Sequence, residues 1–556
     1  MNRFLSGVLR HFQEKPDAVF SRFIRSDEVE AIRWCDLEQS AAAFLAAYRA
    51  QQLPPDALVL IFLRHVPALY GSFLGAMLGG LRPSYMPCAS AKQDPALYWS
   101  SHATLFERIV PALVVADRAT LREMQANGLD LSRTRTLAID DVEPSATRSG
   151  EAAWSEPEED AIGLLQHSSG TTGLKKGVAL SYRAIAAQLE SYGAALGIAE
   201  RDVIVSWLPL YHDMGLVACL LLPLYKGVPL VHLDPFDWLA RPGRLFEHIT
   251  RWKGTLAWLP NFAFDHLAAM AARDAGSYDL TGMRAFINCS EPCRAASFDR
   301  FLEAFASAGA RPEMLQCCYA MAETVFAVSQ TELSRRPRRI RVRSARVQPG
   351  GRVELAGDSA ESQELVECGA AIDGIRIDIY DAQRARLPEG HVGEIGLSGE
   401  FLFAGYNADP ARTLAQLCDG VYFTRDLGFV IDGAIFVLGR IDDLIIVNGR
   451  NVYAHEIEDL LREVDGLKPG RSVALPWSDE RVGSNALIVV AEKLDGSARP
   501  DSELRAEAAR RVFSVTNVMP RTVHLVAEGW LVKTTSGKIS RAGNAVKLAA
   551  MLTGSR

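Results

Sequence analysis

The chain has 556 residues, of which 48% are hydrophobic and 23% charged, an ordinary composition for a globular protein with room for more than one domain. Its formal net charge is -7, which argues against nucleic acid as a partner because nucleic-acid binders carry a basic surface. The nine cysteines include no CxxC pair, which favours a reduced, cytoplasmic protein over a disulfide framework or a zinc site.

Two stretches bear on membranes and secretion. Residues 1–15, MNRFLSGVLRHFQEK, lack the apolar core of a signal peptide. The longest apolar run, 214–225, is shorter than the roughly 20 residues that a bilayer-spanning helix needs. We therefore expect no stable membrane insertion and interpret this run as a buried helix.

From Leu58 to about Ala327, apolar strand-like runs alternate with helical patterns such as 297–309. The clearest runs are AIGLLQHSS (161–169), VIVSWLP (203–209), TLAWLP (255–260) and AFINCS (285–290). Each ends in a turn or loop and is followed by a helical pattern. This alternation predicts an α/β architecture with largely parallel sheets.

The pattern changes after Ser329, where short strands separated by turns run from Ile340 to Arg440. An Asp-Gly pair between two apolar runs predicts a β-hairpin over 429–438. A helix with an acidic first turn is predicted over 455–464. We predict a large N-terminal domain (1–440) of α/β subdomains plus a β-rich subdomain, followed by a small, mobile α+β domain (441–556).

The strongest local motif is HSSGTTGLKKGV (167–178), which follows a predicted strand. Glycines allow backbone N–H groups to approach an anion, hydroxyls add donors and lysine adds positive charge. The motif is not a Walker A loop, because G-x-x-x-x-G-K-[ST] cannot be aligned with it. It indicates phosphate binding, and the alternative is a flexible surface loop.

Four further segments follow this motif in a fixed order. They are SWLPLYHDMGL (206–216), CCYAMAETVF (317–326), YFTRDLGFV with LGRIDDLIIVNGR (422–450), and TTSGKISR (534–541). Together the five segments resemble the adenylate-forming superfamily of acyl-CoA synthetases, peptide-synthetase adenylation domains and luciferases. The resemblance covers nearly the whole chain and implies that it activates a carboxylic acid with ATP.

Within that superfamily the chain is most similar to the fatty acyl-AMP ligases. The segment LPLYHDMGL (208–216) matches their form of the second motif, and INCSEP (287–292) followed by CYAMAET (318–324) matches their adenine-site run. The chain also carries an extra stretch between Ser329 and Cys368, where those ligases have a characteristic insertion.

The resemblance implies a role for each matching residue. The β- and γ-phosphates of ATP would be held by Ser168, Ser169, Thr171, Thr172, Gly173 and Lys176. The adenine would be lined by Ser290, Glu291, Pro292, Tyr319, Ala320, Met321 and Ala322. The remaining roles are Mg²⁺ binding and catalysis by Glu323, ribose binding by Asp426 and Arg440, the mouth of the acyl tunnel for His212, the hinge for Asp442, and contact with the α-phosphate and the substrate carboxylate by the catalytic Lys538.

Several positions depart from the family pattern. Lys175 replaces a common proline, Ala320 and Arg425 replace glycines, and Ala454 replaces a proline. None of these departures removes a reacting group. They affect the detailed geometry of the nucleotide site and the choice of thiol acceptor.

The expected function is ATP- and Mg²⁺-dependent conversion of a fatty or related acid to an acyl-adenylate, followed by transfer to a thiol. We expect the acceptor to be the phosphopantetheine arm of an acyl carrier protein, with free coenzyme A as the alternative. An arginine-rich run, 335–346, is a candidate docking surface for an acidic carrier, although such runs are usually just solvated. A nucleotide-binding protein without catalysis is the alternative from another class.

Overall fold

The computed structural model describes the chain in eleven stretches. They are residues 2–89, 95–144, 154–168, 176–271, 278–343, 347–357, 362–447, 450–479, 484–516, 518–533 and 539–554. The backbone alone is described for Leu97, Ser168, Ile446, Arg450, Asn451, Ser478, Asp479, Ser484, Asn485 and Thr553.

The first sheet has the parallel strand order β4-β3-β5-β6, as predicted for the start of the α/β region. Its strands are β3 (Leu58–Phe62), β4 (Arg82–Tyr85), β5 (Leu113–Ala116) and β6 (Arg135–Ala138). The helices of this part are α1 (Arg3–Glu14), α2 (Trp34–Ala50), α3 (Ala68–Leu78), α4 (Pro95–Ile109) and α5 (Arg118–Ala126). Every residue of β3 is buried, which explains its continuous apolar sequence LVLIF.

Within the described residues, the largest sheet has 14 strands and changes character along its length. Its parallel half has the order β13-β12-β11-β9-β10-β1, and β2 closes the edge in antiparallel pairing. These strands are β13 (Leu315–Ala320), β12 (Ala285–Asn288), β11 (Leu256–Leu259), β9 (Ile204–Ser206), β10 (Leu230–Leu233), β1 (Val19–Arg25) and β2 (Glu28–Arg33). The parallel α/β architecture predicted from the sequence is confirmed here.

The helices beside the parallel half include the predicted buried apolar run. That run forms a π-helix, Met214–Leu221, continued by α7 (Leu222–Lys226), and every residue of the π-helix is buried. The others are α6 (Tyr182–Ala195), α8 (Pro235–Ala240), α9 (Arg244–Trp252), α10 (Asn261–Ala271) and α11 (Ala295–Phe305). None of the helices in the described stretches combines the length and apolar character needed to cross a bilayer.

The antiparallel half of the large sheet is the predicted β-rich part. Its strands are β14 (Ala327–Gln330), β17 (Ala370–Ala371), β18 (Ile375–Tyr380), β19 (Gly393–Gly399), β21 (Leu417–Cys418), β22 (Val421–Ile431) and β23 (Ala434–Arg440). The predicted hairpin is β22–β23, and its turn residues Asp432 and Gly433 both have positive φ, 51° and 75°. Such angles are typical of a tight hairpin turn that an Asp-Gly pair forms easily.

One prediction for the α/β part of the chain was wrong. The run 161–169 is not followed directly by a helix, because β7 (Ile162–Ser168) pairs antiparallel with β8 (Lys176–Ser181) before α6 begins. Strand β20 (Gly405–Tyr406) pairs with the other side of β8. Two apolar runs that flank a glycine-rich turn can form a hairpin as well as a strand–loop–helix unit, and the pairing with β20 favours the hairpin.

The stretch between Ser329 and Cys368 contains a separate two-stranded sheet, β15 (Arg339–Arg343) and β16 (Ser362–Val366). Helix α12 (Pro410–Gln416) follows later in the β-rich part.

After Arg440 the chain builds its own layers. It forms the pair β24 (Leu444–Val447) with β25 (Arg450–Tyr453), the sheet β26 (Leu467–Asp479), β27 (Ser484–Lys493) and β28 (Thr522–Val526), and the helices α13 (Ala454–Leu460), α14 (Asp501–Thr516) and α15 (Arg541–Gly554). The predicted helix 455–464 is α13 with the following 3-10 turn, Leu461–Glu463. Two apolar cores draw only on residues from Ile445 onward.

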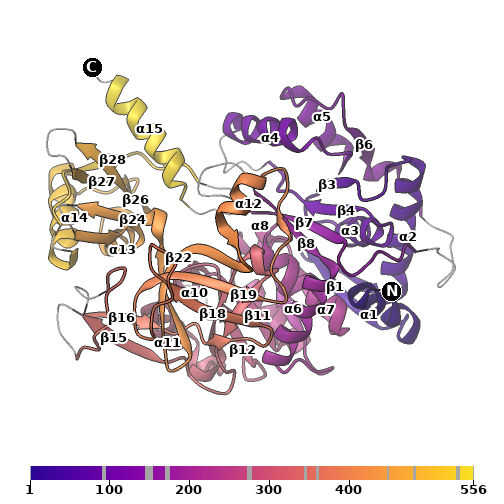
Figure 1. Ribbon diagram of the computed structural model, residues 1–556, viewed down its shortest axis with the longest axis horizontal. Helices are drawn as coiled ribbons and strands as arrows, with labels where there is room; N and C mark the ends of the chain where they lie inside the picture. Colours follow the sequence, from indigo (N-terminus) through magenta and orange to yellow (C-terminus); the bar gives the residue numbers. More distant parts are fainter. Residues whose placement is uncertain are drawn as a thin grey trace.

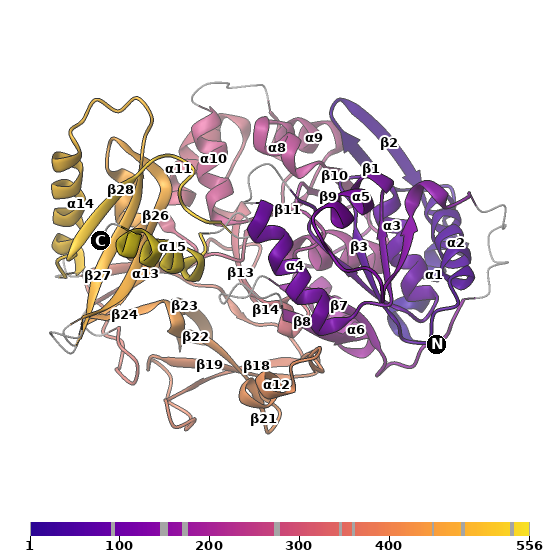
Figure 2. The same cartoon turned by 90° about the horizontal axis from the view of Figure 1, so that it is seen from above.

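The arrangement of these parts is plain in two views. Figure 1 shows β26, β27, β28, α14 and α15 at one end of the molecule and the N-terminal helices α1 and α2 at the other. Figure 2 shows α10 and α11 beside the C-terminal elements, where ion pairs described below join them. We call residues 441–554 the C-terminal region and residues 2–440 the N-terminal region.

Candidate active site

The described parts of the glycine-rich motif are the end of β7 and the start of β8. Ser168 and Lys176 are paired across these two strands. Of the predicted phosphate-binding residues, Ser169, Thr171, Thr172 and Gly173 lie outside the described residues. Lys176 is half-buried, with its ammonium 5.3 Å from the ring centroid of Tyr406. Burial lowers the pKa of Lys176, while the nearby Glu323 carboxylate acts in the opposite direction.

Glu323 sits on a 3-10 turn, Ala322–Thr324, that directly follows β13. Its side chain is buried, and the Tyr406 hydroxyl donates a hydrogen bond to its Oε1 at 2.7 Å. The same hydroxyl lies 2.9 Å from the Gln416 side-chain oxygen. Because Tyr406 comes from β20, which pairs with β8, it links the predicted metal-binding carboxylate to the strand that starts with Lys176.

A second polar group forms around Asp426. The Tyr319 hydroxyl donates to Oδ2 of Asp426 at 2.6 Å, and Nε of Arg440 donates to Oδ1 at 3.2 Å. Asp426 and Arg440 are paired across β22 and β23, so the hairpin itself sets their approach. Burial raises the pKa of Asp426, although Arg440 lowers it, and the Asp426 carboxylate raises the pKa of Arg440. The predicted ribose-binding residues are thus held together beside Tyr319.

The loop predicted to line the adenine leaves β12 and enters α11. The Oε2 atom of Glu291 accepts a hydrogen bond from the Phe262 backbone N–H at 3.0 Å. The Asn261 side-chain oxygen accepts from Asn288 at 2.9 Å and from the backbone N–H of Arg294 at 3.2 Å. The start of α10 therefore holds both ends of the loop that contains Ser290, Glu291 and Pro292.

Strained backbone occurs within three predicted site segments. Ser290, Val325 and Arg425 have φ values of 70°, 64° and 62°. Such angles are unfavourable for residues with a side chain, most of all for a buried, β-branched one such as Val325. Strain of this kind persists only where the surrounding structure enforces it, and it concentrates at functional sites.

The remaining adenine-side residues connect these groups. Ala320 ends β13, and the backbone N–H of Met321 donates to the Phe326 carbonyl at 2.9 Å, which closes a tight turn around Ala322 and Glu323. This turn keeps Tyr319 and Glu323, four residues apart, in their separate hydrogen-bonded groups.

His212 lies just before the π-helix, and its backbone carbonyl accepts from the Leu216 N–H at 2.7 Å. Its ring centroid is 5.0 Å from that of Tyr211. The Gln166 side chain on β7 donates to the Tyr211 carbonyl at 3.1 Å, so this segment lies against the strand that leads to the glycine-rich motif.

The predicted hinge residue Asp442 lies on a 3-10 turn, Ile441–Asp443, directly after β23. The Arg425 guanidinium donates to both of its carboxylate oxygens, at 2.5 and 3.2 Å, and these hydrogen bonds lower the pKa of Asp442. The neighbouring Asp443 pairs with Arg541 of α15 at 2.9 Å.

The predicted catalytic Lys538 lies outside the described residues. Lys533 and Ile539, which flank its segment, form an antiparallel bridge. The side chain of Asn544 is fully buried and donates to the carbonyls of Val532 and Ser540, at 2.9 and 2.7 Å.

Two residues that complete the site were not found from the sequence. Tyr406 binds Glu323, and Arg425 binds Asp442, across 83 and 17 residues respectively. Neither stands in a motif that marks it as a ligand. For Arg425 the useful sequence signal was that it replaces a glycine of the family pattern. A long, charged side chain next to Asp426 must be accommodated and must find an acidic partner.

The carboxylates suit a magnesium site that is completed by the substrate. No group of three or more His, Cys, Asp or Glu side chains in the described residues could hold a metal ion alone. Mg²⁺ is commonly bound by one or two carboxylates together with substrate phosphates. The single buried Glu323, beside the strand that begins at Lys176, fits that mode.

Comparisons with known proteins bear on the family and the fold of the chain. The family model of the AMP-binding enzymes matches residues 8–407. The chain is 30% identical to a long-chain-fatty-acid–AMP ligase of Mycolicibacterium smegmatis, over 92% of this chain and 88% of that protein. It is 27% identical to a medium-chain-fatty-acid–[acyl-carrier-protein] ligase of Moorena producens, over 94% and 90%. A solved structure from a study of fatty acyl-adenylate ligases of E. coli and L. pneumophila superposes with a TM-score of 0.89 at 22% identity, covering 100% of this chain and 99% of that one, and thus shares the fold.

Proposed function

Because the chain belongs to the AMP-binding enzyme family, we propose that it activates a fatty acid with ATP to an acyl-adenylate and then transfers the acyl group to an acyl carrier protein. The observation that carries the proposal is the pair of adjoining polar groups, Glu323 with Tyr406 and Asp426 with Tyr319 and Arg440. The group around Glu323 suits a metal ion that is bound to phosphate, and the group around Asp426 suits ribose hydroxyls. In the family pattern these two groups and the adenine loop line one nucleotide site.

In the first half-reaction a carboxylate oxygen of the acid attacks the α-phosphorus of ATP. The new P–O bond forms as the bond to the β-phosphate oxygen breaks, so that pyrophosphate leaves with its electron pair. Both reactants are anionic, so positioning and positive charge lower the barrier. Lys176 would neutralise part of the phosphate charge, the N–H groups of the glycine-rich motif would donate hydrogen bonds to the phosphates, and Lys538 would meet the α-phosphate and the carboxylate.

Glu323 would hold Mg²⁺, which when bound supplies positive charge to the phosphate oxygens. The hydrogen bond from Tyr406 orients the Glu323 carboxylate, and Asp426 would accept hydrogen bonds from the ribose hydroxyls. His212 would stand at the mouth of the acyl site. These roles follow from the family pattern together with the positions of the described side chains.

For the second half-reaction we propose that residues 441–556 form a small domain that swings about Asp442. A thiolate then attacks the carbonyl carbon of the mixed anhydride, and AMP leaves. The hydrogen-bonded pair of Arg425 and Asp442 lies at the point where such a motion would begin. Domain rotation is a common way to assemble two sites in turn.

The named activity of the Moorena producens relative and the insertion between Ser329 and Cys368 support a carrier protein as the acceptor. The insertion also touches the C-terminal region, because Gln363 on β16 donates to Oε1 of Glu456 on α13 at 2.6 Å. A restrained C-terminal region would disfavour coenzyme A, as the family resemblance implies for this insertion.

The arginine-rich run does not add comparable support. Its ion pairs include Arg335 with Glu332, Arg335 and Arg338 with Glu367, Arg336 and Arg339 with Asp299, Arg338 with Asp432, and Arg343 with Glu354. These acidic partners neutralise much of the local charge, which weakens the steering of an acidic carrier. Arg341 has further interactions, and Arg346 lies outside the described residues.

The test is pyrophosphate release with ATP, Mg²⁺ and a panel of carboxylic acids, followed by competition between coenzyme A and holo carrier proteins, with the thioesters identified by mass. We expect release with fatty acids and thioester on a carrier. No release with any acid would favour a nucleotide-binding protein without catalysis. Efficient acyl-CoA formation with no carrier product would favour an acyl-CoA ligase.

A further inference from the structure

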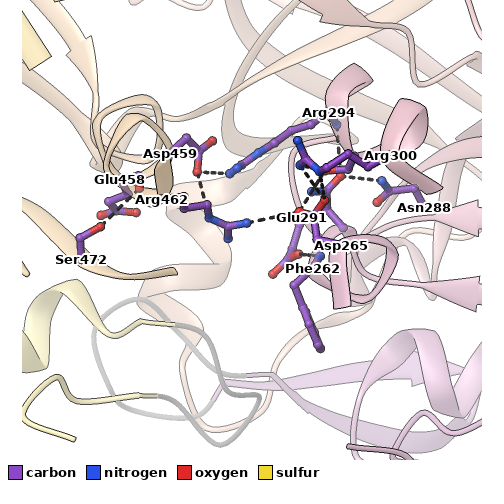
Figure 3. Close-up of polar contacts among 12 residues, drawn as sticks. Phe262, Asp265, Asn288, Glu291, Arg294, Arg300, Glu458, Asp459, Arg462 and Ser472 are labelled. Carbon is purple, nitrogen blue, oxygen red and sulfur yellow. Dashed lines mark hydrogen bonds and ion pairs between the residues drawn. The ribbon is translucent and has the colours of Figure 1, made fainter. Parts of the chain in front are cut away.

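A series of side chains with alternating charges connects the two regions of the molecule (Figure 3). Arg294, at the end of the adenine loop, pairs with Asp459 of α13. Arg462, on the 3-10 turn that follows α13, has its Nε 3.7 Å from Oδ1 of Asp459. The Nη1 of Arg462 reaches back to Oδ2 of Asp265 on α10, at 3.5 Å, and Arg300 of α11 binds Asp265 at 2.7 Å. Positive and negative charges thus alternate along five side chains from both regions.

The first side chain of this series of charges, Arg294, belongs to the adenine loop, and hydrogen bonds fix its position. The backbone N–H of Arg294 donates to Asn261, and Ser297 joins Asn261 to Asp265 through hydrogen bonds of 3.1 Å each. The residue after Asn261 donates its backbone N–H to Glu291. A shift of the loop would therefore move Arg294, and a displaced Arg294 could not meet Asp459.

The burial of these side chains suits contacts that form and break. The side chains of Arg294 and Asp459 are 24% and 26% exposed, so separation of the two regions would return both charges to water. The recovered hydration offsets much of the lost attraction, and the net cost of opening is small. An apolar contact of similar size would leave water-exposed hydrophobic surface in the open state.

We propose that Asp459 and Arg462 form a latch that grips the adenine loop through Arg294 and holds the C-terminal region in the orientation seen here. Arg294 and Asp459 are then positioning residues for the half-reaction carried out in this orientation, a statement that rests on the proposed function. A loop positioned by nucleotide favours the latched state, and release of the latch allows the C-terminal region to turn for the other half-reaction.

The experiment reverses the charges one at a time and together, as Arg294→Asp, Asp459→Arg and the double variant. The two half-reactions are measured separately, as pyrophosphate release and as transfer from supplied acyl-adenylate to a holo carrier protein. We expect each single reversal to change the ratio of the two rates by about 5-fold, a typical size for coupling between sites. The double reversal restores the pair between positions 294 and 459 but places a second positive charge beside Arg462, so it should recover a part of the change in the ratio.

Small-angle X-ray scattering of the same proteins gives a readout that needs no activity. We expect a larger or more variable radius of gyration in each single variant and partial recovery in the double. The matched control reverses an exposed pair that lies wholly in the N-terminal region, Asp160 with Arg183, whose atoms are 2.7 Å apart. Reversal of that pair should leave both the rate ratio and the scattering unchanged.

Unchanged scattering in both single variants overturns the latch, as does a double variant that behaves no better than the singles. If Asp459→Arg fails to fold, judged by its melting temperature, Asp459→Asn and Arg294→Gln replace the reversals. Two neutral side chains restore no ion pair, so unchanged scattering in both of these single variants is then the outcome that overturns the latch. A wild-type protein that activates no acid refutes the proposed function, while the scattering of the variants still decides whether the latch exists.

Discussion

The cluster proposed to bind the nucleotide and the contacts with the C-terminal region use similar side chains in different surroundings. In the cluster, Glu323 and Asp426 are each 8% exposed and accept hydrogen bonds from tyrosine hydroxyls. Beside the proposed hinge, Arg425 and Asp442 each have side chains that are 46% exposed. Buried carboxylates with fixed donors make a rigid site, whereas solvent-accessible ion pairs are weak and can be exchanged. Of these two groups, the rigid one is the cluster proposed to bind the nucleotide, and the weakly held one lies where the motion is proposed to begin.

The largest expected effect tests whether the C-terminal region supplies chemistry as well as motion. Lys538→Ala should reduce acyl-adenylate formation by about 10²–10³, the usual cost of one contact to charge that develops in the transition state. Transfer from supplied acyl-adenylate should suffer less. Pyrophosphate release and single-turnover transfer measure the two steps, and an equal loss in both would contradict the assignment.

The next effect tests the rigidity of the buried cluster. Tyr406→Phe removes the hydroxyl that donates to Glu323 and leaves this buried carboxylate with one hydrogen bond fewer. Such an unsatisfied buried group costs about 1–3 kcal/mol of free energy. We expect kcat/KM for adenylation to fall about 10-fold, mostly because the variant binds Mg²⁺ and ATP more weakly. Titrations of Mg²⁺ and of ATP measure this change. Tyr98→Phe is the control, because that buried hydroxyl donates to the Pro87 carbonyl instead. A similar fall in the control would mean that Tyr406 acts only through stability.

A smaller effect is expected beside the proposed hinge, where strain and an ion pair oppose one another. Arg425→Gly relieves a φ of 62°, worth about 1 kcal/mol or more, and removes an exposed pair worth about 0–1 kcal/mol. Folding stability should therefore be unchanged or slightly higher. The ratio of the two half-reaction rates should change about 3-fold, because Asp442 loses its partner.

Arg425→Ala separates the two contributions, since alanine removes the ion pair and keeps the unfavourable φ. It should change the rate ratio as much as glycine does but lower the melting temperature. A normal rate ratio in both variants would show that the pair does not restrain the hinge.

The smallest effect concerns the contact between the insertion and α13. Burial raises the pKa of Glu456 to about 7 from an ordinary value of 4.5, so the folded chain keeps a proton that the unfolded chain releases. The contribution of this group to stability is present below about pH 4.5 and is lost as the pH rises toward 7. In Glu456→Gln the side chain stays neutral and keeps an oxygen that accepts from Gln363. The fall in the free energy of unfolding with rising pH should therefore be about 1 kcal/mol smaller in the variant than in the wild type. Urea unfolding at pH 5, 6, 7 and 8 measures it, and an unchanged pH profile would contradict it.

Local pattern was enough to predict much of the fold. Continuous apolar runs predicted the buried parallel strands, Asp432-Gly433 predicted the turn between β22 and β23, and an acidic first turn predicted α13. The run 161–169 was misjudged because apolar runs on both sides of a glycine-rich turn do not reveal whether they pair with each other.

For the site, the sequence by itself determined which residue types stand in the five motifs and therefore the family. Tertiary structure alone decided their partners: Tyr406 for Glu323 across 83 residues, Asp426 for Tyr319 across 107, and Asp459 for Arg294 from another region. The physical reason is that burial and periodicity are written in neighbouring residues, because they reflect local helix and strand geometry. A hydrogen bond or ion pair depends instead on which surfaces pack together, and many arginines and carboxylates in this chain could have paired otherwise.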